Sequence, residues 1–370
     1  MRKKLLYILT DIATNGGVDR IVFDKINALI DSYDISILYL GNRNSPFYKL
    51  DSKVKTYNLP LRGKGILKYI HLINEYKKLL NEIKPNLIIN ANSILLTWII
   101  PFIGKQKNVL ELHQSYEGVK IFNDTNYGVG TLKNKFHFWL RDVVYPHYDK
   151  VVVLTNDDKN KWGYNNMIVI PNFTNISYCG DYSIESKTAL SIGRLEHQKD
   201  FQLMVKAWKI VNQKHSDWHL NIFGEGSMKK EIEELIVKYG LEQNVFLKGN
   251  TTNVIHEYSN SSFFVSSSRY EGLPLVLIEA QCCGLPCVGF DITGVSDMIK
   301  DNETGILVKE RTPEQLALGI CKLIENPNLR ESMHQNTLLD SEQYTKEYVM
   351  GKWISLFEKF NAVNGTSNQG

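Results

Sequence analysis

Short apolar runs alternate with longer amphipathic segments along the whole chain. Each run holds four to seven residues rich in branched or aromatic side chains, a pattern typical of strands buried in a sheet. The segments between them, such as 18–30, 200–214 and 227–240, repeat apolar residues at helical spacing. This alternation predicts an α/β fold in which a doubly wound parallel sheet with helices on both faces occurs twice. The predicted strands are 4–10, 35–40, 86–90, 109–113, 150–155, 167–170, 188–193, 219–224, 245–249, 263–268, 286–290 and 305–308.

The length of the chain, 370 residues, exceeds what one hydrophobic core usually fills, so two domains are expected. The polar stretch 170–187 lacks helical spacing and divides the two halves. The predicted boundaries are 1–172 for an N-terminal Rossmann-like domain, 173–187 for a linker and 188–345 for a C-terminal Rossmann-like domain. A last helix at 346–362 is predicted to return to the N-terminal domain, and the tail 363–370 is expected to be disordered.

One stretch, 85–104, carries no charged residue and is about long enough to cross a membrane. It also contains Asn86, Asn90, Asn92 and two prolines, so we predict a buried strand, a turn and a helix, with a surface-lying apolar helix as the alternative. The basic start MRKKLLYIL runs directly into the polar TDIATNGG, so no signal peptide is predicted and a cytoplasmic location is expected.

The cysteines follow neither a paired framework nor zinc-ligand spacing. We expect them to be buried thiols of a cytoplasmic protein. They are Cys179, Cys282, Cys283, Cys287 and Cys321.

Charge is divided unevenly along the chain. Residues 1–180 contain 24 Lys and Arg against 15 Asp and Glu, whereas residues 181–370 contain 19 against 25. The basic first half indicates an anionic partner. No arginine-rich run and no aromatic-plus-basic RNA motif occurs, so no nucleic acid partner is predicted, and an anionic membrane surface or a phosphate-bearing substrate is favoured. The basic amphipathic stretch 63–84 fits such a contact, with an ordinary solvated helix as the alternative.

Ligands of open parallel sheets gather at the carboxyl ends of the strands, so the loops after the predicted strands are the candidate sites. Gly16 and Gly17 allow a tight turn before a helix whose first amides can face an anion, although such a turn is also common in plain loops. His113 ends a predicted strand and would lie beside the same edge of the sheet, with a structural histidine as the alternative.

Candidate residues of the second half follow the same rule. Arg194 and Lys199 lie five positions apart after a strand and could clamp a diphosphate, with solvated surface charges as the alternative. Gly224 precedes an amphipathic helix. Gly249 and Asn250 follow another strand, where we expect uncapped amides and room for a base to lie flat.

Two carboxylates, Glu271 and Glu279, stand on either side of a Gly-Leu-Pro turn. Pro274 suits the first turn of a helix, so Glu271 should precede the helix and Glu279 should lie within it. Carboxylates accept hydrogen bonds from hydroxyls, and a nucleotide sugar has hydroxyls on both sides of its diphosphate. We therefore predict that the acids bracket a diphosphate held by backbone amides. These amides belong to Gly272, Leu273 and Leu275.

The chain resembles a retaining GT-B glycosyltransferase of glycosyltransferase family 4, of the kind that extends bacterial polysaccharides or lipid-linked oligosaccharides. The motifs that carry this resemblance occur in the order typical of the family over nearly the whole chain. The matching features are the E-x7-E motif at Glu271 and Glu279, GGVDR at 16–20, GRL-x3-K at 193–199, His113, FGEG at 223–226, GLPCV at 284–288, DITGVSDMI at 291–299 and TGILV at 304–308. The chain departs from the family at Asp19 and Asp297, where Glu is usual. The resemblance therefore gives only weak support for assigning the family's roles to these two aspartates.

The resemblance implies a C-terminal domain that binds the nucleotide sugar and an N-terminal domain that binds a glycan or lipid-linked acceptor. Glu279 would then hold ribose hydroxyls, Glu271 the hydroxyls of the transferred hexose, and Arg194 with Lys199 the diphosphate, while His113 would face the hexose. UDP is favoured over GDP by resemblance. No D-x-D motif occurs, so no metal and no other cofactor is expected.

Two other functions stay open at this point: a sugar-nucleotide epimerase or hydrolase on a similar scaffold, and a non-catalytic partner that binds nucleotide sugars. A dinucleotide-dependent oxidoreductase is not favoured, because neither half has G-x-G-x-x-G followed by an acid at the required distance.

Overall fold

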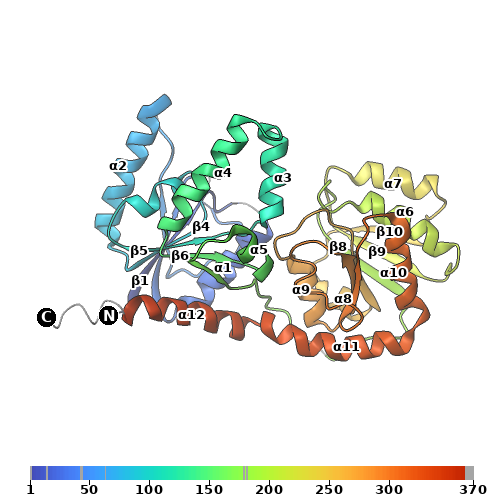
Figure 1. Ribbon diagram of the computed structural model, residues 1–370. Helices are drawn as coiled ribbons and strands as arrows, with labels where there is room; N and C mark the ends of the chain where they lie inside the picture. The colour runs from blue at the N-terminus through green and yellow to red at the C-terminus, as the bar shows by residue number, and fades with distance from the viewer. Residues whose placement is uncertain are drawn as a thin grey trace. The chain divides into compact units, whose positions relative to one another are not determined.

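The chain forms two compact units in the computed structural model, which describes residues 2–13, 16–41, 45–62, 64–177, 180 and 182–362 (Figure 1). Unit 1 comprises Met1–Pro171 and Met350–Gly370, and unit 2 comprises Asn172–Val349. The predicted disordered tail 363–370, Gly63 and Cys179 lie outside the described residues.

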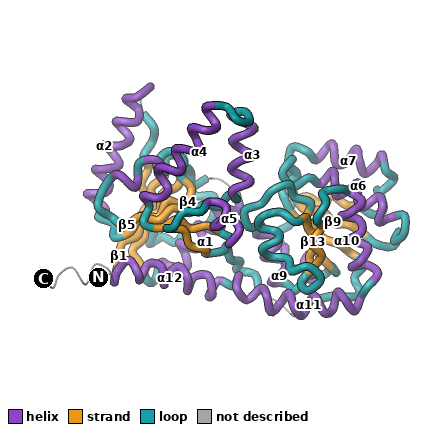
Figure 2. Tube along the Cα trace, viewed as in Figure 1, coloured by secondary structure: helices purple, strands orange, loops and turns teal. Residues whose placement is uncertain are grey.

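The strands of unit 1, orange in Figure 2, lie together in one sheet. This sheet has seven strands in which all neighbours are parallel, in the order β3-β2-β1-β4-β5-β6-β7. Parallel neighbours require crossover connections. Helices lie in these connections except between β2 and β3, where the described residues form none. The strands are β1 (Lys3–Leu9), β2 (Tyr33–Tyr39), β3 (Lys55–Asn58), β4 (Leu87–Asn92), β5 (Lys107–Glu111), β6 (Lys150–Val153) and β7 (Met167–Val169).

The helices of unit 1 bury one apolar face against this sheet. In α2, for example, Leu72, Tyr76 and Leu80 recur at helical spacing and join the core formed with strand residues such as Ile8 and Ile88. The helices are α1 (Gly17–Leu29), α2 (Gly65–Ile83), α3 (Tyr116–Tyr127), α4 (Leu132–Val144), α5 (Asn156–Trp162), the short 3₁₀ helices η1 (Leu96–Trp98), η2 (Ile100–Phe102) and η3 (Tyr145–His147), and α12 (Lys346–Ala362) from Met350 onward.

Unit 2 holds a six-stranded parallel sheet in the order β10-β9-β8-β11-β12-β13. Its core contains the fully buried Trp208 of α6, packed with strand residues such as Ile222 and Val265. The strands are β8 (Thr188–Ile192), β9 (His219–Phe223), β10 (Val245–Gly249), β11 (Phe263–Ser266), β12 (Cys287–Phe290) and β13 (Gly305–Val308). The helices are α6 (Phe201–Asn212), α7 (Lys229–Lys238), α8 (Val254–Ser259), α9 (Leu275–Cys282), α10 (Pro313–Glu325), α11 (Pro327–Ser341) and the 3₁₀ helix η4 (Glu342–Tyr344). The predicted α/β class with two doubly wound parallel sheets is thus confirmed.

Two local features differ from the expectation. Strand β3 was not predicted, because its sequence KTYN has no apolar run and it lies at the exposed edge of the sheet. The helix predicted within 85–104 is instead η1 and η2: Pro101 cannot donate a backbone hydrogen bond, and the buried Asn90 and Thr97 side chains are bonded to each other at 2.7 Å.

Within the described part of the chain, no helix combines the length and the apolar character needed to cross a membrane. The prediction of buried thiols is confirmed for Cys282, Cys283, Cys287 and Cys321, which are buried and form no disulfide.

Candidate active site

Four neighbouring strands of unit 2 present the candidate loops side by side. The chain leaves β8 toward β9 and β10 on one side and later returns to β11 on the other side. The order of the strands therefore reverses between β8 and β11, and such a reversal point is where open parallel sheets bind ligands. Arg194 and Lys199 follow β8, and Glu271 follows β11, on the two sides of this point.

Lys199 and Glu271 form an ion pair across the reversal point. The Lys199 Nζ lies 2.6 Å from the Glu271 Oε1, and the two side chains are 17% and 8% exposed. Arg194, in contrast, is exposed. The sequence assigned Lys199 to a diphosphate and Glu271 to a sugar, and the structure brings these two side chains together.

The loops after β8 and β11 are also joined through their backbones. The Ser267 hydroxyl donates a hydrogen bond to the Lys199 carbonyl at 2.7 Å, and the Gln198 side chain donates to the Tyr270 carbonyl at 3.0 Å. The Arg269 amide donates to the Gln198 carbonyl at 2.8 Å. The position of Lys199 relative to Glu271 is therefore set by several bonds and not by the ion pair alone.

A buried acid behind these loops was missed by the sequence reasoning. Asp200, with a positive φ of 49°, accepts from Arg269 at 2.7 Å and from Arg311. The Arg311 guanidinium also donates to the carbonyls of Ser267 and Ser268 at 3.0–3.1 Å. The cluster holds the loop after β11 against the start of α6. No local pattern pointed to Arg311, because it lies more than a hundred residues from Asp200.

Glycines allow the loops after β8 and β9 to approach closely. A Cβ at Gly224, whose φ is 139°, would lie 1.9 Å from the Gly193 carbonyl oxygen. The Gly224 amide donates to the Gly249 carbonyl at 2.8 Å, so it is already bonded within the protein. Close packing between backbones accounts for the glycine at position 224 without any ligand.

The loop after β10 differs in part from the expectation. Gly249 has a φ of 68°, which favours glycine, and Asn250 is exposed. The helix that follows is α8, and the Asn253 side chain caps it by accepting from the His256 amide. The prediction of uncapped amides at this helix was therefore wrong, because a polar side chain already satisfies one of them.

Glu279 lies inside α9, as predicted, and is 3% exposed. The Tyr258 hydroxyl lies 3.2 Å from its Oε2 and 3.0 Å from the Val276 carbonyl. Burial, with the nearby charge of Glu279, raises the pKa of Tyr258 well above its ordinary value. Tyr258 therefore stays protonated and can donate to the carboxylate. The sequence reasoning missed Tyr258, which lies 21 residues before Glu279.

The turn before α9 contains the remaining candidates of unit 2. Pro274 is the N-cap residue, and Leu275 is the first residue of the helix. The Leu273 carbonyl accepts from the Asn172 side chain at 3.1 Å. Gly294, with a φ of 83°, packs against the Gly272 carbonyl, where a Cβ would come within 2.2 Å. The segment 291–299 thus supports this turn.

In unit 1, Gly16 is the N-cap residue of α1 and Gly17 its first residue. Gly16 has no side chain with which to cap this helix end, and a Cβ at Gly16 would approach the buried Asp19 carboxylate at 3.0 Å. The other departure from the family, Asp297, lies in unit 2 with its Oδ2 3.4 Å from the Gly294 amide. Thr14 and Asn15, just before the glycines, lie outside the described residues.

His113 follows β5 in unit 1, and its side chain is 7% exposed. Its Nε2 lies 3.4 Å from the Glu111 carboxylate, and neither ring nitrogen makes a well-aligned hydrogen bond to any residue that the structure describes. Glu111 is itself bonded to Lys25 of α1 at 2.5 Å. The sequence reasoning did not single out either of these two charged residues.

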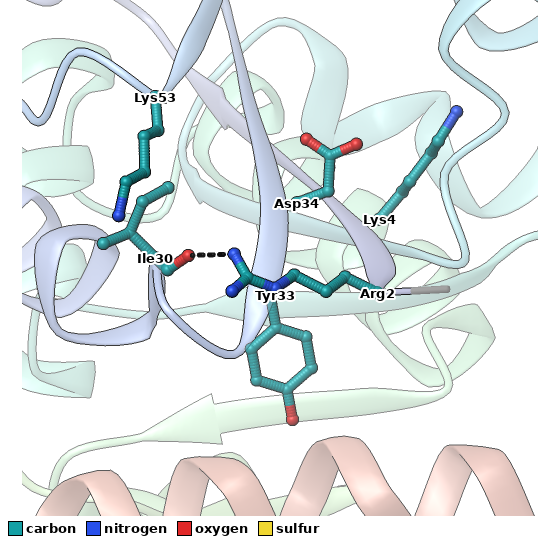
Figure 3. A pocket seen from close by; sticks show the side chains of 6 residues that line it. All are labelled: Arg2, Lys4, Ile30, Tyr33, Asp34 and Lys53. Carbon is teal, nitrogen blue, oxygen red and sulfur yellow. Dashed lines mark hydrogen bonds between the residues drawn. The ribbon is translucent and has the colours of Figure 1, made fainter.

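A pocket of unit 1 lies where β1 and β2 begin (Figure 3). Parallel strands begin at the edge opposite to the one where they end, so this pocket is separate from the candidate loops. Its cations already have partners: Lys53 pairs with Asp31 at 3.0 Å, Lys4 donates to the Ile83 carbonyl, and Arg2 donates to the Ile30 carbonyl. It is lined by Arg2, Lys4, Ile30, Tyr33, Asp34 and Lys53.

Comparison with known proteins decides the family. Residues 183–339 match the family described as glycosyl transferases group 1. Over 361 residues the chain is 30% identical to an uncharacterized glycosyltransferase of Haemophilus influenzae, covering 95% of this chain and 99% of that protein. The chain belongs to the group 1 glycosyl transferases. The prediction of a glycosyltransferase enzyme is confirmed.

This glycosyltransferase is also 28% identical, over 370 residues, to the amylovoran biosynthesis glycosyltransferase AmsD of Erwinia amylovora, covering 95% of this chain and 98% of that protein. Among solved structures, Staphylococcus aureus TarM in complex with fondaparinux, α-GlcNAc-glycerol and UDP has a TM-score of 0.71 at 19% identity, covering 96% of this chain and 99% of that chain. The likeness to TarM shows the fold, and the prediction of a GT-B glycosyltransferase is confirmed.

Proposed function

We propose that this enzyme is a retaining glycosyltransferase of family 4 that moves a hexose or N-acetylhexosamine from a nucleotide diphosphate sugar to a glycan or lipid-linked acceptor. The observation that carries the proposal is the pairing of Lys199 with Glu271 at the reversal point of the sheet in unit 2, with Arg194 exposed on the same loop. Cations suit a diphosphate and carboxylates suit sugar hydroxyls, so this set fits a nucleotide sugar.

Each of these residues has a role in the proposal. Glu271 holds the Lys199 ammonium in place before a donor arrives, and the exposed Arg194 is available for the first contact with the diphosphate. Glu279, supported by Tyr258, accepts from the ribose hydroxyls. Gly249, Asn250 and the turn 272–275 surround the nucleotide.

The proposed donor is a UDP-sugar, supported by the UDP bound to TarM, and a role in surface polysaccharide assembly is supported by the relative AmsD. In the reaction, the bond from the anomeric carbon to the diphosphate oxygen breaks. The acceptor oxygen forms its new bond on the same face, and its proton passes to the leaving diphosphate. Arg194, Lys199 and the amides at Gly17 stabilise the developing charge, and His113 faces the hexose.

Two measurements test this proposal. Thermal shifts with UDP-Glc, UDP-Gal, UDP-GlcNAc, UDP-GalNAc and GDP-Man identify the donor. Transfer to an added acceptor is then compared with turnover of the donor alone. Donor turnover without any transfer would favour an epimerase or hydrolase, and binding without turnover would favour a non-catalytic partner.

Addition of EDTA is expected to leave most of the transfer activity intact. The chain has no D-x-D motif, and Arg194 and Lys199 supply positive charge at the diphosphate. The measurement is the initial rate with and without EDTA, followed by add-back of manganese or magnesium. Complete loss of activity that either metal restores would contradict the prediction.

We also propose that unit 1 contacts an anionic membrane surface. The first half of α2 exposes Leu67, Tyr69 and Ile70 beside basic residues, and the hairpin of α3 and α4 exposes Phe136 at 53% and Trp139 at 55%. Aromatic and aliphatic side chains next to lysines are typical of surfaces that lie on a bilayer.

Binding to vesicles that contain anionic lipid is expected to weaken with salt and with reversal of four lysines of α2 or its N-cap to glutamate, since each lysine near such a surface contributes about 1 kcal/mol. The measurement is liposome flotation. The matched control reverses four exposed lysines of unit 2. Flotation that responds neither to anionic lipid nor to the α2 reversals would refute the contact. The variants change Lys64, Lys68, Lys77 and Lys78, and the control changes Lys206, Lys230, Lys238 and Lys309.

A further inference from the structure

An ion pair lies in the interior of unit 1, far from the usual surface position of charged side chains. The Lys25 Nζ is 2.5 Å from both carboxylate oxygens of Glu111, and the side chains are 1% and 3% exposed. Two charges withdrawn from water are costly unless they are paired and further supported. The residues around the Lys25–Glu111 pair should therefore indicate its role.

Aromatic faces surround the ammonium group. The Lys25 Nζ lies 3.9 Å from the ring centroid of Trp353 and 5.5 Å from that of Tyr7. Trp353 belongs to α12, the segment by which the end of the chain joins unit 1, whereas Lys25 and Tyr7 belong to its first helix and first strand. The faces of these rings favour a cation, which supports Lys25 in its charged form.

Burial by itself pushes the pKa of Glu111 up, but Lys25 and His113 outweigh burial and hold it below the ordinary value. Burial lowers the pKa of Lys25, and Glu111 opposes that effect. Burial and the charge of Glu111 raise the pKa of Tyr7, so its hydroxyl remains protonated. Glu111 is thus a carboxylate at neutral pH.

One oxygen of this carboxylate, Oε2, which Lys25 contacts, also lies near His113. The Glu111 Oε2 lies 3.4 Å from the His113 Nε2, two residues further along the chain where β5 has ended. A carboxylate beside one ring nitrogen favours the tautomer that carries its proton there and restricts rotation of the ring. The other nitrogen, Nδ1, has no hydrogen-bond partner among the described residues.

We propose that Lys25, Glu111 and Trp353 are positioning residues for His113: the lysine fixes the carboxylate, the carboxylate fixes the orientation and tautomer of the imidazole, and the last helix completes the support. The proposal rests on the proposed role of His113 opposite the transferred sugar. It also gives a functional reason for α12 to pack on unit 1.

The central experiment replaces both charges at once, as Lys25→Met with Glu111→Leu, because an apolar pair of similar size avoids leaving one buried charge alone. The ring nitrogens of His113 are followed by ¹⁵N NMR and assigned by comparison with His113→Gln. We expect Nε2 to carry the proton in the unsubstituted enzyme and both tautomers to be populated in the double variant. We expect kcat to fall by about tenfold or more with KM for the donor nearly unchanged.

A second variant, Trp353→Leu, tests the contribution of the last helix without touching either charge. We expect a smaller fall in kcat and a partial change in the His113 ring signals. Leu356→Ala is the matched control, since Leu356 is also buried in α12, at 6% exposure. It should lower thermal stability without changing the His113 signals.

Unchanged His113 ring signals in the double variant would overturn the proposal, whatever the activity. Equal effects of Trp353→Leu and Leu356→Ala on the ring signals would overturn the part assigned to α12. A failure of the proposed function would look different. His113→Ala would then transfer sugar at the normal rate, or the enzyme would use no donor. The ring signals of His113 in the other variants would still show whether Lys25, Glu111 and Trp353 orient it.

Discussion

Replacement of Arg194 or Lys199 by alanine is expected to lower the turnover of sugar transfer by at least about a hundredfold, because each change removes a donor aimed at charge that develops on the leaving diphosphate. The two variants should differ in a second property. Arg194 is exposed, so its loss should leave thermal stability nearly unchanged. Loss of Lys199 leaves the Glu271 carboxylate, 8% exposed, without its ion-pair partner, so stability should fall as well.

The measurements are kcat with the identified donor and the thermal midpoint of each variant. Lys229→Ala is the control, because Lys229 belongs to an exposed ion pair with Glu225 near the same loops and should be close to neutral. The double variant Lys199→Ala with Glu271→Gln should recover stability but not activity, which separates the two effects. Near-normal rates in both single variants would rule out the clamp.

Changing each acid of the E-x7-E motif to its amide is expected to affect different properties, UDP binding in one case and sugar transfer in the other. Glu279→Gln should weaken binding of free UDP by about ten- to a hundredfold, since a hydrogen bond to a charged group contributes roughly 1.5–3 kcal/mol and the ribose remains after the sugar has left. Tyr258 can still donate to the glutamine oxygen, so the fold around α9 should persist.

Glu271→Gln should lower transfer by a similar factor and leave UDP affinity unchanged or slightly raised. The UDP affinity should not fall, because the Lys199 ammonium lies 2.6 Å from Glu271. Neutralising Glu271 removes a group that competes with the diphosphate for this cation.

Calorimetric titration of UDP into both variants, alongside initial rates with the donor, distinguishes these outcomes. Glu242→Gln, on an exposed position of unit 2, is the control for loss of one negative charge. If Glu271→Gln lost UDP binding and Glu279→Gln kept it, the ribose and hexose assignments would have to be exchanged.

The loops that carry the candidate site could be found from the sequence because the residues around each strand end show where the strand stops. An apolar run stops, a glycine or a charge follows, and a helical pattern begins; this is how Gly16, His113, Arg194 and Gly224 were singled out. The same local reasoning failed at β3 and at the helix expected within 85–104. An exposed edge strand needs no apolar run, and the 3₁₀ turns there are held by side-chain bonds such as that between Asn90 and Thr97.

The partners of the candidate residues could not be found in this way. Arg311 and Asp200 are 111 residues apart, and Tyr258 precedes Glu279 by 21 residues across a strand and a turn. Nothing in the spacing of these residues indicates a contact. The order of the strands creates it.

The two parallel α/β sheets and the loops that end their strands could be predicted from the sequence, because the periodicity of buried positions is a property of neighbouring residues. Which charged side chains meet depends on how distant segments pack. Lys199 reaches Glu271 over 72 residues because β11 returns to the side of β8, and Lys25 reaches Glu111 over 86 residues because β1 and β5 both adjoin β4. The spacing of charged residues along the chain does not show which of them form pairs. The environment of a charged side chain is fixed only when distant segments pack together and exclude water.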